Sequence, residues 1–484
     1  MEEVVERSVQ GGTAMSADNI QALPASAQGM EAELGKQMKP RHLVMMSLGC
    51  AIGTGLFVGT GKAIAVAGPA VLVAFGFASL LVILIIRMIG EMAAANPNSG
   101  ALSVYVGQAL GPTAGITVGW LWWLTMVISI ASEATATSVI LHAYWPSLPQ
   151  WALALSFVGG FTIINLAGSS KFGEMEFWFA GLKIAVIIAF VAVGMAIIAG
   201  IIPHVPSPGL GNLFNHGGFM PTGLAGVGAA LLIVTFTYGG TEIIAIAAAE
   251  TEDPKRNISR AIRSMVYRIV IFFVVPVAIM VTVLPWNSHD LKAGPFVAIL
   301  KLAGIPGVET LITMTIALAL LSSLNANIYG ASRLIFSLAE RGSAPRRFTQ
   351  LASNRVPRAA MLASVAFGFA AVLMNYLWPE TVLMLLLNAV GSVNLILWAS
   401  AIVSQIILRR RADKDPNAEL PVKMWAFPYL SYLAAAMMAG FVAVSLFDPE
   451  SRNQMITTGI TAAAIALIYQ IRGRRMSKYA ANRD

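Results

Sequence analysis

Long apolar blocks are the feature of this sequence that most restricts its fold. The blocks contain about 20 residues or more, which lets a helix cross the roughly 30 Å hydrocarbon core of a bilayer. Charged residues make up only 12% of the 484-residue chain, whereas soluble proteins contain about 25%. We therefore predict an all-α polytopic membrane protein with twelve transmembrane helices, near residues 43–67, 71–95, 114–143, 151–168, 177–201, 222–249, 264–285, 308–338, 358–377, 380–407, 424–446 and 455–471.

Basic residues are distributed unevenly between the connections of these helices. An even number of spans places both termini on one side, and the connections on that side hold most of the Lys and Arg residues. The opposite connections at 144–150 and 202–221 contain none. The positive-inside rule therefore predicts that both termini are cytoplasmic.

Several functional classes fit this sequence poorly. The net charge of +8 is spread over short connections, so no basic stretch is long enough for a nucleic-acid-binding domain. Cys50 is the only cysteine, which excludes an intrachain disulfide. The sequence contains no HExxH, GxxxxGK(S/T), CxxC or GxSxG motif, which argues against an enzyme or an ATP-driven pump. Residues 1–40 are polar and resemble no signal peptide, so we expect a cytoplasmic tail there.

The first apolar block is interrupted by three glycines, Gly49, Gly53 and Gly55. Each glycine costs about 1 kcal/mol of helix propensity relative to alanine. Broken backbone at membrane depth is tolerated where it lines a cavity or contacts a ligand. The interruption therefore predicts a small-molecule site near the middle of the membrane.

A similar interruption occurs in the sixth span, where Gly239 and Gly240 follow the hydroxyl residues Thr235 and Thr237. The two interruptions lie five spans apart, so the second half of the chain is expected to insert upside down relative to the first. Corresponding interruptions in inverted halves indicate the binding site of a secondary transporter. The alternative is that these glycines only allow close helix packing.

Two broken helices with opposed ends can hold a zwitterion. The N-terminal end of a half-helix offers free N–H groups to a carboxylate, and the C-terminal end offers carbonyls to an ammonium group. We expect the substrate carboxylate near the N–H groups of Thr54, Gly55 and Leu56. The full set of expected substrate contacts is Ile52, Gly53, Thr54, Gly55, Leu56, Glu133, Phe236, Thr237, Tyr238 and Gly239.

Several motifs resemble those of one transporter family. They are Gly53-Thr54-Gly55-Leu56-Phe57-Val58-Gly59, Ala67-Gly68-Pro69-Ala70, Arg87-Met88-Ile89-Gly90-Glu91-Met92-Ala93, Glu174-Met175-Glu176-Phe177-Trp178 with Lys183, Ala247-Ala248-Ala249-Glu250-Thr251-Glu252-Asp253-Pro254 and Ala331-Ser332-Arg333. With these motifs the chain resembles the amino acid–polyamine–organocation (APC) superfamily and, within it, the bacterial amino acid transporter (AAT) family. Gly119-Trp120-Leu121-Trp122-Trp123 and Gly217-Gly218-Phe219-Met220-Pro221 resemble the γ-aminobutyrate (GABA) permeases.

The resemblance implies a LeuT-like fold, a five-plus-five inverted repeat with broken helices 1 and 6. On this basis residues 41–202 form the first repeat, 222–408 the second and 424–472 the last two spans. Residues 1–40 and 473–484 are then the cytoplasmic tails. The resemblance also implies proton-coupled uptake by alternating access.

Ionisable residues within the spans each need a reason, because an intramembrane charge costs about 2.5–3.5 kcal/mol on insertion scales. The resemblance implies that Lys183 couples transport to protons, near the backbone of span one and the hydroxyls of Ser322 and Ser323. The alternative is that Lys183 reaches the cytoplasmic headgroups. Glu133 in span three and Glu242 after the second interruption either carry protons or meet a substrate ammonium, or they make structural hydrogen bonds.

Arg87 and Glu91 are spaced i,i+4 near the cytoplasmic end of span two. This spacing predicts a structural pair or an element of the cytoplasmic gate.

These observations together predict a proton-coupled amino acid transporter of the bacterial cytoplasmic (inner) membrane, with GABA or a related small amino acid as the favoured substrate. Permeases of the same fold for cationic, aromatic or other neutral amino acids remain open, as do an exchanger and a uniporter. A ligand-binding membrane sensor or a channel is the alternative from another class. We expect no cofactor or metal beyond the coupling proton, no nucleic-acid partner, contact with lipid, and a functional monomer.

Overall fold

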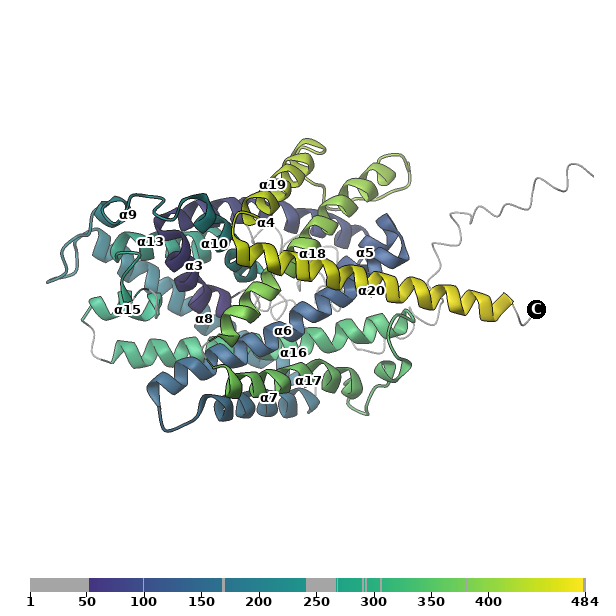
Figure 1. The fold of residues 1–484 in the computed structure, drawn as a ribbon, viewed down its shortest axis with the longest axis horizontal. Coiled ribbons are helices and arrows are strands. Elements are labelled where there is room, and N and C mark those ends of the chain that lie inside the picture. Colours follow the sequence, from purple (N-terminus) through teal and green to yellow (C-terminus); the bar gives the residue numbers. More distant parts are fainter. Residues whose placement is uncertain are drawn as a thin grey trace, which may run out of the picture. The chain divides into compact units, whose positions relative to one another are not determined.

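The computed structural model describes residues 52–481, except 99, 168–169, 241–266, 268, 290, 292–293, 305–306 and 380, and the side chains of 170–175 and 472–481. All the secondary structure in this part of the chain is helical, which confirms the predicted all-α class. The helices, shown in Figure 1, are η3 (Gly55–Gly59), α3 (Thr60–Ala67), η4 (Gly68–Ala70), α4 (Val71–Ala95), α5 (Ala101–Leu110), α6 (Pro112–Tyr144), α7 (Gln150–Leu166), α8 (Ser170–Ile198), α9 (Gly211–Phe214), α10 (Gly223–Tyr238), η5 (Val270–Val274), α13 (Val275–Val283), α15 (Pro295–Leu302), α16 (Val308–Glu340), η6 (Arg346–Thr349), α17 (Arg358–Leu377), α18 (Val382–Ala412), α19 (Tyr429–Ser445) and α20 (Pro449–Ala481).

Each of the twelve predicted spans overlaps a helix of the described residues. Seven helical stretches among them are long and apolar enough to cross a membrane, and five further apolar helices of 10–17 residues are shorter. One of the seven stretches, Gly55–Ala95, contains the second predicted span and residues 55–67 of the first, and the two meet at the turn η4. The count of twelve spans and the inverted repeat therefore stay predictions.

Helix α5 is an element that the pattern of long apolar blocks does not predict. It has ten residues, so it is too short to cross a bilayer at 1.5 Å per residue. It packs against α6 and α18, and Arg341 after α16 donates a hydrogen bond to the hydroxyl of Ser103 on α5 (2.8 Å).

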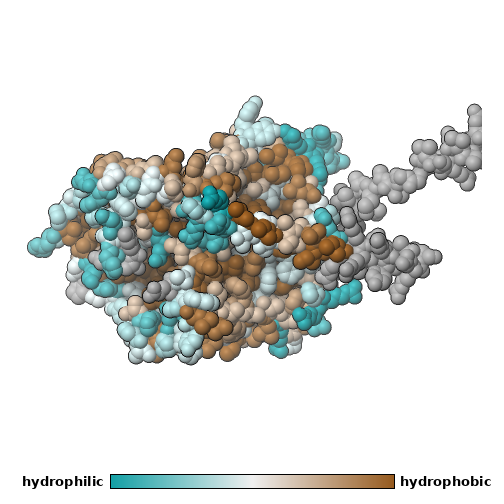
Figure 2. All heavy atoms as spheres, in the orientation of Figure 1, coloured by the Kyte–Doolittle hydropathy of each residue, from teal (hydrophilic) through white to brown (hydrophobic). Residues whose placement is uncertain are grey.

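Two long helices, α6 and α16, run alongside each other through the helical assembly (Figure 1). Helix α6 also packs against α7, α17 and α18, while α10 packs against α3, α4, α18 and α19. Apolar side chains cover much of the face seen in Figure 2, with hydrophilic residues at its left and right and in one group near its middle. Apolar surface of this extent is expected where a protein meets lipid.

Candidate substrate site

The first predicted helix break lies at Ile52 and Gly53, just before the helical turn that begins at Thr54. The carbonyl of Gly53 accepts hydrogen bonds from the N–H groups of Leu56 (3.1 Å) and Phe57 (3.2 Å). Residues Gly55–Gly59 form a π-helical turn that continues directly into α3. The start of this turn therefore presents backbone N–H groups at a helix N-terminus inside the assembly.

A carboxylate of the protein itself occupies part of this N-terminus. Thr54 donates to Glu133 of α6 through its backbone N–H (3.1 Å to Oε2) and through its hydroxyl (2.7 Å). Glu133 is buried, with 4% of its surface exposed. An anion at this position is stabilised by the helix dipole. Of the three N–H groups expected to bind a substrate carboxylate, that of Thr54 is thus hydrogen-bonded to Glu133, and that of Leu56 to the carbonyl of Gly53.

The second predicted break lies where α10 ends at Tyr238, and it meets the first one directly. The hydroxyl of Thr237 donates to the carbonyl of Gly55 (3.0 Å). A Cβ atom on Gly55 would stand 2.4 Å from the Cα of Thr237. Only glycine fits at this position, because the Cα of Thr237 is a backbone atom and cannot move away by a side-chain rotation.

A cavity of about 510 Å³, its open mouth included, lies beside this contact. It is lined by Gly53, Gly55, Trp122, Thr125, Met126, Ser129, Glu133, Phe236, Thr237, Gly239, Gly240, Asn327, Val390 and Asn394. Six of the ten expected substrate contacts are therefore brought together. Glu133 is the one charged side chain among these lining residues.

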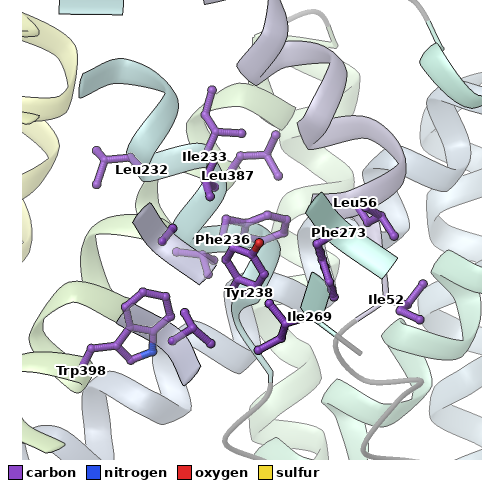
Figure 3. Close-up of a cluster of buried hydrophobic side chains, with 14 of the residues drawn as sticks. Ile52, Leu56, Leu232, Ile233, Phe236, Tyr238, Ile269, Phe273, Leu387 and Trp398 are labelled. Atoms are coloured by element: carbon purple, nitrogen blue, oxygen red, sulfur yellow. The ribbon is translucent and has the colours of Figure 1, made fainter. Parts of the chain in front are cut away.

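The remaining four expected contacts are close to the cavity in sequence but do not line it. Ile52, Leu56 and Tyr238 are fully or almost fully buried, and Thr54 is covered by Glu133. The hydroxyl of Tyr238 shares a hydrogen bond of 2.6 Å with Ser79 of α4. Its ring packs against Phe273, and Figure 3 shows both rings within a cluster of buried apolar side chains. Tyr238 thus anchors the end of α10 to its neighbours.

Apart from Thr237, the uncharged polar side chains in the cavity wall were not predicted from the sequence. Asn394 of α18 donates to the carbonyl of Thr235 (3.4 Å), and Asn327 of α16 donates to the carbonyl of Ser323 (3.0 Å). Many Ser, Thr and Asn residues lie within the apolar blocks. No spacing rule separates those that face a cavity from those that bond their own helix.

Lys183 of α8 is completely buried close to the first break. Its ammonium donates to the hydroxyl of Ser323 (3.1 Å), and that hydroxyl donates to the carbonyl of Ile52 (3.0 Å). Glu133 lies nearby, because a Cβ on Gly53 would stand within 3 Å of both Glu133 Oε1 and Ser323 Oγ. The ammonium is therefore held inside the protein, next to the backbone of the first break.

A second buried carboxylate, that of Glu176 of α8, also lies near Lys183. Its Oε1 atom is 3.9 Å from the ammonium nitrogen of Lys183. The hydroxyl of Ser322 lies 2.8 Å from both carboxylate oxygens of Glu176. Glu176 was not among the residues predicted to function, although its spacing of seven residues from Lys183 places both on one face of a helix.

Arg87 and Glu91 of α4 both contact the segment that follows α18. Glu91 accepts hydrogen bonds from Gln405 (2.8 Å) and Arg409 (2.9 Å) of α18 and from the backbone N–H of Met424. Arg87 donates twice to the carbonyl of Lys423 (2.9 and 2.7 Å). Glu242, the last of the expected coupling residues, lies outside the described residues.

Comparisons with known proteins give a consistent result. The profile of the family described as Amino acid permease matches residues 42–477. The chain is 41% identical to the γ-aminobutyric acid permease of Bacillus subtilis, over 93% of this chain and 96% of the relative. It is 42% identical to an aromatic amino acid transport protein of Corynebacterium glutamicum, over 90% of this chain and 94% of the relative. A manganese transporter of Eremococcus coleocola has a similar fold, with a TM-score of 0.51 at 13% identity, covering 91% of this chain and 93% of the other.

Proposed function

Because the chain belongs to the amino acid permease family, we propose that it imports an amino acid together with a proton by alternating access. Membership of the family makes the chain a multi-pass membrane transporter of amino acids and not an enzyme. The proton, the identity of the substrate and the direction of transport belong to the proposal. We take the monomer as the transporting unit.

The proposed topology has twelve spans with both termini in the cytoplasm of a bacterial cell. Residues 41–202 and 222–408 form the two inverted repeats, and 424–472 form the last two spans. Residues 1–40 and 473–484 are the cytoplasmic tails. The distribution of Lys and Arg between the connections supports this orientation through the positive-inside rule.

The substrate binds in the cavity between the two breaks, and this position carries the proposal. Gly55 lies in the first turn of a helix, where N–H groups lack acceptors within the helix. Thr237 and Gly239 stand at the opposite end, where the last carbonyls of α10 lack donors of their own helix. These two ends suit the carboxylate and the ammonium group of one zwitterion. The carboxylate of Glu133 adds attraction for the ammonium group.

GABA or a related small amino acid is the favoured substrate. Two relatives described as GABA permeases, from Bacillus subtilis and Escherichia coli, are 41% and 38% identical to this chain. The 42% identity to an aromatic amino acid transport protein favours an aromatic substrate as the second candidate. The side chains of Trp122, Met126 and Phe236 in the cavity wall are suitable contacts for an aromatic ring.

Replacing Gly55 by Val tests the position of the site. The new side chain collides with the backbone of Thr237, so the two helix breaks move apart and substrate binding is lost. A Cβ on Gly76 of α4 would meet no heavy atom within 4 Å, so Gly76→Val is the matched control. Binding of labelled substrate to purified protein is the measurement. Wild-type affinity in a folded Gly55→Val protein would falsify this site.

The substrate and the coupling are tested separately in proteoliposomes. Competition of unlabelled GABA, lysine, proline and phenylalanine against labelled GABA ranks the candidate substrates. Proton flux measured with substrate alone, and with counter-substrate inside, distinguishes a symporter from a uniporter or an exchanger. Substrate-independent ion conductance would favour a channel, and binding without counterflow would favour a sensor.

A further inference from the structure

Glu176 is a buried acid that the proposed transport mechanism does not yet use. It lies on α8 with no solvent-exposed surface, two helical turns before Lys183. A carboxylate in such a position is costly unless it is paired and hydrogen-bonded. Its contacts are the hydroxyl of Ser322 and, at 3.9 Å, the ammonium of Lys183.

The hydrogen bond of Lys183 to Ser323 also brings its ammonium close to the first helix break, where Glu133 lies. Glu133 and Ser323 both pack against Gly53, because a Cβ on Gly53 would stand 2.5 Å from Glu133 Oε1 and 2.8 Å from Ser323 Oγ. Ser323 is the residue to which Lys183 donates. We call Glu133, Glu176 and Lys183 the lysine cluster.

Within the described residues, the helices packed around α8 bring no further charge to the lysine cluster. Helix α16 contributes the hydroxyls of Ser322 and Ser323, and η5 and α13 have no ionisable side chains. Arg333 of α16 is buried but follows Ser323 by ten positions, which is about 15 Å along the helix. Helix α15 carries Lys301, whose side chain is 68% exposed and pairs with Glu309 at the surface.

The charges of the lysine cluster do not balance when all three groups are ionised. Two carboxylates and one ammonium leave one net negative charge, and an uncompensated buried charge is strongly unfavourable. One bound proton makes the cluster neutral. We propose that the lysine cluster is a single binding unit for one transported proton, with Glu176 as the partner that shares this proton with Lys183.

Lys183 and Glu176 share the proton by a transfer within their ion pair. An N–H bond of the Lys183 ammonium breaks as an O–H bond forms on Glu176, leaving an amine and a neutral carboxylic acid. No other reactant is needed, and the net charge of the buried cluster stays the same. In the proposed topology, Glu176 lies on the cytoplasmic side of Lys183, so this transfer moves the proton inward.

The lysine cluster is connected to the substrate site on both sides. On one side, Ser323 accepts a hydrogen bond from Lys183 and donates one to the carbonyl of Ile52. On the other side, Glu133 accepts hydrogen bonds from the N–H and the hydroxyl of Thr54. A change of protonation in the cluster thus alters the partners available to the broken backbone where substrate is proposed to bind. This inference rests on the proposed proton-coupled transport.

The variant Glu176→Gln tests the inference in proteoliposomes made with the full chain. Gln keeps the shape of the side chain but removes one negative charge, so Lys183 and Glu133 balance without an additional proton. Accumulation of labelled GABA driven by an imposed pH gradient is expected to fall about tenfold or more. Counterflow of GABA, which needs no net proton movement, is retained. Glu309→Gln, the same change at an exposed site on α16, is the control and leaves both activities unchanged.

A second variant, Ser322→Ala, removes the hydroxyl that contacts Glu176 and leaves every charge in place. It is expected to displace the pH profile of gradient-driven uptake, and Glu176→Asp is expected to restore part of the coupling that Glu176→Gln loses. A proton-to-substrate ratio and pH profile equal to wild type in Glu176→Gln overturn the inference. If Glu176→Gln does not reach the membrane, an unchanged pH profile in Ser322→Ala overturns it instead. Failure of the wild-type protein to accumulate any tested amino acid is a different result, because it contradicts the proposed function.

Discussion

Two buried polar clusters in this protein use similar residues in opposite ways. In the first, Glu91 of α4 accepts hydrogen bonds from Gln405 (2.8 Å) and Arg409 (2.9 Å) of α18. We call these three residues the α4–α18 cluster. In the lysine cluster, two carboxylates share one ammonium, and the ion pair of Lys183 with Glu176 is 3.9 Å long. The first cluster has a close donor for each carboxylate oxygen, whereas the second lacks one positive charge.

Under the proposed mechanism, the difference separates a structural tie from a site that responds to protons. A guanidinium keeps its charge at every physiological pH, so the pair of Arg409 and Glu91 has one charge state. A buried lysine and two buried acids can reach a net charge of zero in more than one way, because the bound protons can be distributed differently among the three groups. The α4–α18 cluster is therefore expected to govern stability, and the lysine cluster is expected to govern coupling.

Removing the only ammonium of the lysine cluster should have the largest effect. In Lys183→Met, two buried carboxylates have no cation and both must be protonated to become neutral. We expect GABA accumulation driven by a pH gradient to fall at least about a hundredfold, since the penalty for an unpaired buried charge is several kcal/mol. Steady-state accumulation in proteoliposomes is the measurement, and Lys301→Met at an exposed position is the control. Wild-type pH dependence in Lys183→Met would instead mean that Lys183 has a structural role and takes no part in coupling.

The complementary change in the other cluster should affect stability and leave coupling intact. Glu91→Gln removes the charge that faces Arg409, and hydrogen bonds to charged groups are worth about 1.5–3 kcal/mol. We expect a loss of about 2 kcal/mol, seen as a lower midpoint of thermal unfolding in detergent. The pH profile of uptake should match that of the wild type. A displaced profile with unchanged stability would show that the α4–α18 cluster also responds to protons, and the contrast between the two clusters would disappear.

The sequence predicted features that depend on local composition. The length of the apolar blocks predicted where helices of the described residues occur. A helical turn begins just after Gly53, and α10 ends just before Gly239. The family resemblance placed Lys183 near Ser323 and the backbone of span one, and the structure contains hydrogen bonds from Lys183 to Ser323 and from Ser323 to Ile52. Their function stays a prediction.

The sequence could not predict which distant residues meet. Glu91 was considered with Arg87 because only the i,i+4 spacing is visible locally, yet Glu91 bonds Arg409, 318 residues away. The N–H of Thr54 was expected to bind substrate, but it donates to Glu133, which lies 79 positions further along the chain. Such pairs follow from helix packing, and helix packing leaves no periodic trace in a single sequence.

The smallest expected effect concerns Asp413, which forms an ion pair with Arg409 of the α4–α18 cluster. Asp413 bonds Arg409 at 2.8 Å, but its side chain is 45% exposed, and exposed pairs are worth about 0.2–1 kcal/mol. Asp413→Asn alone should therefore lower stability by about 0.5 kcal/mol. In a Glu91→Gln background, Arg409 keeps the ion pair with Asp413 after losing the one with Glu91, so the same change should cost more. A double-mutant cycle of thermal unfolding measures this coupling. Additive effects would mean that Glu91 and Asp413 act on Arg409 independently, and Asp413 would then contribute nothing to the α4–α18 cluster.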